Sequence, residues 1–183
     1  VKKPDALVSS NTSTMQLAKL VEGRSENFKQ NFMITHFFNP VRHMPLVETV
    51  VGKDTRPDVI QKVTDFLDQR MGKNVVPCKD TPGFKGNRIG GYWLLKSAVE
   101  AVKQGIGLDE ADAILGAPVG FKSSGVFGTM DVVGMGTSIN VMKSLKKSLP
   151  KTDDFHTVYA EAEELGILAR MDEMLASGRM GRM

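Results

Sequence analysis

Residues 31–51 read NFMITHFFNPVRHMPLVETVV, and this stretch decides how the first half of the chain folds. A run of apolar, β-branched and aromatic residues over 31–38 predicts a strand, and a second apolar run over 46–51 predicts another. The Asn-Pro pair at 39–40 predicts a turn between them. We therefore expect a hairpin that places the carboxylate of Glu48 beside the imidazole of His36.

His36 and Glu48 together have the composition of a general-base pair. An imidazole changes its charge close to working pH, which suits proton transfer to and from an alcohol. A neighbouring carboxylate fixes the tautomer of the ring and stabilises its protonated form. Taken alone the pair is ambiguous, because a histidine beside aromatic residues is more often a core or surface residue than a catalytic one. His43 is expected to be a solvated loop residue, since Arg42 and Pro45 lie close to it in the sequence.

Composition narrows the class of protein. A length of 183 residues with 41% hydrophobic residues allows one domain, or two small ones, with a substantial core. The formal net charge of +3 is mildly basic, and no Lys/Arg block predicts a nucleic-acid groove. Cys78 is the only cysteine, which excludes an internal disulfide and indicates a reducing compartment. No apolar run reaches membrane-spanning length and no signal peptide opens the sequence, so we expect a soluble intracellular protein.

Residues 1–83 are expected to form an α/β unit. Its other predicted elements are strands over 6–9 and 74–78, helices over 12–22 and 56–72, and a loop over 23–30. Thr12 or Ser13 is expected to cap the first of these helices. This alternation is typical of the C-terminal part of a Rossmann-type doubly wound sheet. The strand end that opens onto Ser10-Asn11-Thr12 is the kind of place where such sheets bind ligands.

The turn Asp80-Thr81-Pro82-Gly83 is predicted to mark a domain boundary, and residues 84–183 are expected to be all helical. The predicted helices cover 87–104, 108–115, 125–133, 137–149, 152–165 and 168–176. The methionines of this half are expected in the core or a subunit interface, because methionine is a flexible gap filler. Segment 131–139 looks like the start of a dinucleotide fingerprint. Ile139 occupies the third glycine position, however, so we interpret the segment as a helix–helix turn.

Three motifs together resemble the signature of the L-3-hydroxyacyl-CoA dehydrogenase family. They are SNTS at 10–13, then HFFNPV at 36–41 with MPLVE at 44–48, and then KDTPGF at 79–84 with NR at 87–88. The motifs occur in the family's order with similar spacings, and the resemblance covers nearly the whole chain. Segment 118–134 also resembles the dehydrogenase part of some multifunctional bacterial β-oxidation proteins.

The resemblance implies NAD-dependent oxidation of (S)-3-hydroxyacyl-CoA to 3-ketoacyl-CoA in fatty-acid β-oxidation. It makes His36 the general base and Glu48 the residue that orients it, while Ser13 and Asn87 hold the reacting oxygen of the substrate. The positions that match binding residues are Asn11 and Ser13 for the cofactor, and Ser13, Asn39 and Asn87 for the substrate. The resemblance further implies NAD as the cofactor and no metal. It also implies a homodimer through the helical domain, and a cytoplasmic location of bacterial type rather than the mitochondrial matrix or peroxisome.

The sequence departs from the family pattern at its start. The unit that carries G-x-G-x-x-G is missing and Val1 is not an initiator methionine, so we expect a fragment that binds NAD poorly and is inactive alone. A related dehydrogenase that acts on free β-hydroxyacids stays open, although the His36-to-Glu48 signature points away from it. Two functions from other classes also stay open. One is a structural role, since a lens crystallin resembles this family. The other is a dimerisation and substrate-capping module of a multienzyme chain. The intact Ser13, His36, Glu48 and Asn87 favour the enzyme.

Overall fold

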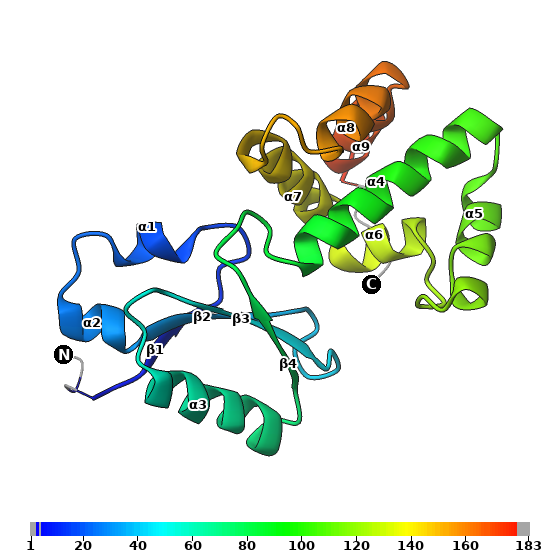
Figure 1. Cartoon of the computed structure of the whole chain (residues 1–183). Coiled ribbons are helices and arrows are strands. Elements are labelled where there is room, and N and C mark those ends of the chain that lie inside the picture. The colour runs from blue at the N-terminus through cyan, green and yellow to red at the C-terminus, as the bar shows by residue number, and fades with distance from the viewer. Residues whose placement is uncertain (1–2, 4, 179–183) are drawn as a thin grey trace. The chain divides into compact units, whose positions relative to one another are not determined.

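The structure is a computed structural model that describes residue 3 and residues 5–178. Residues 1, 2, 4 and 179–183, at the outer ends of the two predicted domains, lie outside the described residues. The backbone divides into two compact units, with the division between Gly86 and Asn87. The first unit contains a sheet and short helices, and the second is helical (Figure 1).

The first unit is built on a four-stranded mixed sheet with the order β1-β2-β3-β4. Its strands are β1 (Val8–Ser10), β2 (Phe32–Phe37), β3 (Leu46–Val51) and β4 (Asn74–Cys78). The pairs β1–β2 and β3–β4 are parallel, whereas β2 and β3 are antiparallel. The predicted hairpin between 31–38 and 46–51 is therefore confirmed. Residues 32–36 of β2 are all buried, as expected for a central strand that is covered on both faces.

Two short helices, α1 (Leu17–Val21) and α2 (Glu26–Gln30), lie on the same face of the sheet, where Leu17 and Phe28 pack against Phe32 and Ile34. The prediction that α1 begins at Thr12 or Ser13 is wrong. Its first amides are capped from a distant turn: the Asp80 carboxylate accepts hydrogen bonds from Leu17 N at 2.7 Å and Ala18 N at 3.0 Å. A cap supplied from so far along the chain leaves no local sequence signal.

The prediction of a loop over 23–30 is wrong in its second half, where α2 forms. Ser25 caps this helix by accepting a hydrogen bond from Phe28 N. On the other side of the sheet (Figure 1), α3 (Pro57–Asp65) begins at the predicted proline and continues as a π-helical turn, η1 (Phe66–Arg70). Gly72, with a φ of 61°, lies beyond it, in agreement with the predicted glycine stop.

The second unit contains a long helix, α4, which starts at the last residue of the first unit, and shorter helices that follow it. Its elements are α4 (Gly86–Gln104), α5 (Leu108–Ile114), η2 (Ala117–Val119), α6 (Phe127–Val133), α7 (Met135–Ser148), α8 (Phe155–Glu164) and α9 (Ile167–Ala176). The helical prediction is confirmed. Segment 131–139 is a helix–helix turn as predicted, because Gly134 with a φ of 90° separates α6 from α7.

The core of the second unit confirms one of the two places predicted for its methionines. Met130, Met135, Met142 and Met171 are buried among leucine, valine and alanine side chains from α4 and α6 to α9. Among the described residues, no helix combines the length and the apolar character needed to cross a membrane.

Candidate active site

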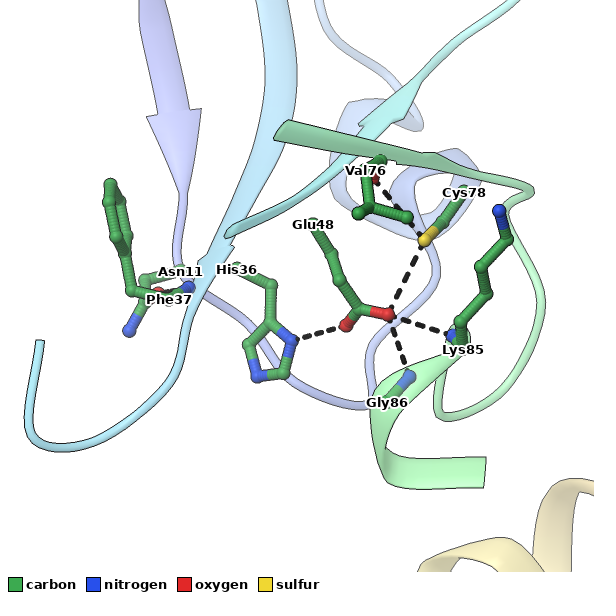
Figure 2. Close-up of polar contacts among 8 residues, drawn as sticks. All are labelled: Asn11, His36, Phe37, Glu48, Val76, Cys78, Lys85 and Gly86. Atoms are coloured by element: carbon green, nitrogen blue, oxygen red, sulfur yellow. Dashed lines mark hydrogen bonds and ion pairs between the residues drawn. The ribbon is translucent and has the colours of Figure 1, made fainter. Parts of the chain in front are cut away.

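The antiparallel pairing of β2 and β3 brings the two predicted catalytic side chains together. His36 and Glu48 are direct cross-strand partners, so their side chains leave the sheet on the same face. His36 Nδ1 lies 2.8 Å from Glu48 Oε2 (Figure 2). The contact is buried, since His36 is 5% exposed and Glu48 is 1% exposed. The sequence pattern thus predicts the geometry of this pair correctly.

The other carboxylate oxygen of Glu48 accepts hydrogen bonds from three groups. Lys85 N donates to Oε1 at 2.9 Å, Gly86 N donates at 2.7 Å, and the thiol of Cys78 donates at 3.4 Å (Figure 2). Gly86 is the first residue of α4, so the carboxylate also lies at a helix N-terminus.

These contacts determine the charge of Glu48. Burial alone raises the pKa of this carboxyl, but the hydrogen bonds from His36, Gly86, Lys85 and Cys78 outweigh it and leave the pKa below its usual value. Glu48 is therefore a carboxylate at neutral pH. An ionised carboxylate only accepts hydrogen bonds, so Nδ1 of His36 carries a hydrogen and Nε2 keeps its lone pair. A ring in this tautomer can accept a proton at Nε2.

Two aromatic rings flank the imidazole. The centroid of the Phe38 ring lies 4.6 Å from that of His36, and the centroid of Phe84 lies 5.8 Å from it. Gly86 leaves room for Phe38: a Cβ on this residue would lie 2.5 Å from Phe38 Cζ. The rings shield the imidazole from water, so Glu48 is the group that stabilises the positive charge which the ring gains on accepting a proton.

Asn11 lies next to this pair, at the carboxyl end of β1. Because β1 and β2 are parallel, their carboxyl ends lie at the same edge of the sheet, which is where ligands bind to open α/β sheets. Asn11 Oδ1 accepts a hydrogen bond from Phe37 N at 2.8 Å, directly beside His36 (Figure 2). The side chain of Asn11 is exposed. Ser13 is half-buried in the turn that follows.

The remaining predicted site residues lie at the ends of two elements. Asn39 is exposed in the turn after β2. Asn87 is half-buried, follows Gly86 in the first turn of α4 and is the first residue of the second unit. His43 is exposed, as its neighbours predict. Among the described residues, no group of three metal-ligating side chains forms a candidate metal site.

Sequence reasoning missed the three groups that hold Glu48 Oε1. Two of them are backbone amides, which carry no side-chain signature, although the Asp-Thr-Pro-Gly turn before a helix indicates that free amides are close. The third, Cys78, reaches Glu48 only because β4 pairs with β3 in parallel. Sequence alone gives no signal for that strand order.

Comparisons with known proteins give a consistent family assignment for the chain. Residues 1–81 match the family model described as "3-hydroxyacyl-CoA dehydrogenase, NAD binding domain", and residues 83–182 match "3-hydroxyacyl-CoA dehydrogenase, C-terminal domain". A putative fatty acid oxidation complex trifunctional enzyme from Rickettsia prowazekii is 38% identical over 98% of this chain and 24% of its own length. A probable 3-hydroxyacyl-CoA dehydrogenase from Bacillus subtilis is 40% identical over 98% of this chain and 22% of its own length.

A solved structure gives the same result. The (S)-3-hydroxybutyryl-CoA dehydrogenase PaaH1 from Ralstonia eutropha matches with a TM-score of 0.71 and 27% identity, over 96% of this chain and 57% of that one. The chain thus spans about a quarter of the length of the first curated relatives and over half of this solved structure. Because its two parts match the two domain models of one family in order, the chain belongs to the 3-hydroxyacyl-CoA dehydrogenase family, whose first domain binds NAD.

Proposed function

We propose that the full-length protein oxidises (S)-3-hydroxyacyl-CoA to 3-ketoacyl-CoA with NAD, as a step of fatty-acid oxidation. The observation that carries the proposal is the buried contact between His36 Nδ1 and Glu48 Oε2, which leaves Nε2 as a proton acceptor. The names of the relatives support the same reaction class.

In the proposed reaction His36 Nε2 takes the proton of the substrate's 3-hydroxyl group. Bound NAD supplies the acceptor for the hydride that leaves carbon 3. The substrate oxygen becomes a carbonyl oxygen as the proton and the hydride leave. The Glu48 carboxylate stabilises the positive charge that the imidazole gains. In the reverse direction His36 returns the proton to the same oxygen. Proton transfer of this kind contributes typically ~10² to 10⁴ in rate.

The cofactor and substrate roles of four further residues belong to this proposal. The position of Asn11 at the carboxyl end of β1, with its side chain bonded to Phe37 N, suits a group near the nicotinamide. Ser13, in the turn that follows, is proposed to bind both the cofactor and the substrate oxygen. Asn87 is proposed to hold the same oxygen, and Asn39 to contact the substrate.

The test is NADH oxidation by the full-length protein with acetoacetyl-CoA, comparing the wild type with His36→Gln and His43→Gln. His43 is an exposed loop histidine and is the matched control. We expect His36→Gln to lose ~10² to 10⁴ in kcat with KM retained, and His43→Gln to match the wild type. Unchanged turnover in His36→Gln would contradict the role of His36. No turnover in a folded, NAD-binding wild type would contradict the reaction and favour a structural role.

Assembly and location remain predictions. We propose a homodimer formed through the helical unit, on whose surface Ile89, Leu108 and Val132 are exposed apolar side chains. Analytical ultracentrifugation of the full-length protein tests this, and a monomer at micromolar concentration would contradict it. A cytoplasmic location and the inactivity of residues 1–183 on their own are likewise predictions.

A further inference from the structure

Cys78 contacts the candidate active site from the strand β4. Its Sγ lies 3.4 Å from Glu48 Oε1 and 3.6 Å from the carbonyl oxygen of Val76 (Figure 2). The ionised carboxylate is the stronger acceptor of the two, so the thiol hydrogen points to Glu48. Among the hydrogen bonds that the structure describes at Oε1, the thiol donates from a side chain, whereas the other two donors are the backbone amides of Lys85 and Gly86.

We propose that Cys78 is a positioning residue, whose thiol holds the Glu48 carboxylate in the rotation that turns Oε2 toward His36. Its kinetic consequence rests on the function proposed above, whereas the contact itself does not. Lys85 and Gly86 approach Oε1 from the segment that leads into α4, and Cys78 approaches it from β4 (Figure 2). Donors from two different elements restrict rotation of the carboxylate more than the two successive amides do alone.

The thiol also weakens the attraction of the Glu48 carboxylate for the proton that it shares with His36. Donors that share one carboxylate each take part of its negative charge, so removing one strengthens the attraction for the others. Without the thiol, the pair is expected to hold a proton to higher pH. Cys78 is suited to this role because it stays a thiol: burial and the charge of Glu48 raise its pKa to about 11.

The first test measures NAD reduction with (S)-3-hydroxybutyryl-CoA, the direction in which His36 must be unprotonated. The full-length protein is compared as Cys78→Ala and Cys78→Ser, with Val75→Ala as the control. Val75 is half-buried on the same strand and is not among the hydrogen-bond partners that the structure describes for Glu48. Cys78→Ala is expected to lower kcat several-fold at constant KM and to move the acid limb of the pH profile up by about half a unit. Cys78→Ser keeps a donor and is expected to restore both. If Cys78→Ala and Val75→Ala have the same kcat and pH profile, the proposal is wrong.

The second test does not need turnover. Alkylation of Cys78 by iodoacetamide at pH 8 is followed by mass spectrometry of its peptide in the wild type, Glu48→Gln and His36→Gln. Removing the charge of Glu48 is expected to raise the alkylation rate about ten-fold, whereas His36→Gln keeps that charge and stays slow. Equal rates in all three would overturn the thiol–carboxylate contact. If the wild type shows no turnover but Glu48→Gln is still alkylated faster than the wild type, the thiol–carboxylate contact is supported while the proposed function fails.

Discussion

Replacing Glu48 by glutamine separates what this residue does for the fold from what it does for the imidazole. The amide keeps an oxygen that Lys85 N and Gly86 N can bond, since they donate at 2.9 Å and 2.7 Å to one side of the carboxylate. Its NH₂ group then faces His36 Nδ1. Because an NH₂ group only donates, Nδ1 must become the acceptor and the hydrogen moves to Nε2. The ring is then in the tautomer that cannot take a proton from the substrate.

The two expected effects differ greatly in size. Glu48→Gln exchanges a charge-assisted hydrogen bond for a neutral one, so we expect a loss of about 1–2 kcal/mol in the free energy of unfolding. Glu48→Ala leaves two amides and the His36 ring without an acceptor in a buried site, and we expect it to lose about 3–5 kcal/mol. For turnover we expect Glu48→Gln to lose about 10³- to 10⁴-fold, because the tautomer is wrong.

The assays are urea unfolding and NAD reduction with (S)-3-hydroxybutyryl-CoA, the direction in which His36 takes the proton, both on the full-length protein. The informative result is a Glu48→Gln variant that is nearly as stable as the wild type and almost inactive, beside a Glu48→Ala variant that is much less stable. Turnover of Glu48→Gln within a few-fold of the wild type would refute the reasoning from the tautomer. Equal stability of the two variants would refute the assignment of the buried donors.

Three further predictions concern stability. The pKa of Glu48 in the folded state is lower than its usual 4.5, so the ionised carboxylate stabilises the fold above pH 4.5, and this stabilisation is lost as the pH falls further. We therefore expect the difference in urea midpoint between the wild type and Glu48→Gln to shrink below about pH 4.5. Gly125→Ala places an alanine in the left-handed region, and its Cβ would lie 2.5 Å from Asp112 Cα. We expect this variant to lose about 2–4 kcal/mol in the free energy of unfolding, measured with urea. The control is Gly120→Ala, whose Cβ meets nothing within 4 Å, and we expect it to lose about 1–2 kcal/mol. Asp80→Ala removes the cap of α1 and is expected to cost about 0.5–2 kcal/mol, with faster hydrogen exchange at Leu17 and Ala18.

Local patterns were sufficient for most of the backbone. The strands at 46–51 and 74–78 have the predicted bounds, and the long helix of the second unit begins within one residue of its prediction. Each of these elements is specified by residues that lie within it or beside it. The start of α1 was predicted wrongly for the opposite reason, because its cap is Asp80, more than sixty residues away.

The candidate site divides in the same way. The pairing of His36 with Glu48 follows from two strands and a turn, and these are readable from residues 31–51. The groups that hold the second oxygen of Glu48 are not readable, because they depend on the order of strands in the sheet and on backbone amides. The residues that set the charge of a site are thus harder to predict from sequence than those that carry its chemistry.

The strand register of β2 and β3 has a consequence for chimeric proteins. His36 faces Glu48 only while each strand keeps its number of residues, since a shift by one residue turns a side chain to the opposite face of the sheet. Other contacts stabilise the turn between the strands. The ammonium group of the buried Lys73 donates hydrogen bonds to the carbonyl oxygens of Val41 and Met44. A block from 32 to 51, exchanged whole between relatives, carries the contact between His36 and Glu48 with it. A recombination point that adds or deletes one residue inside either strand destroys the pair without changing either residue.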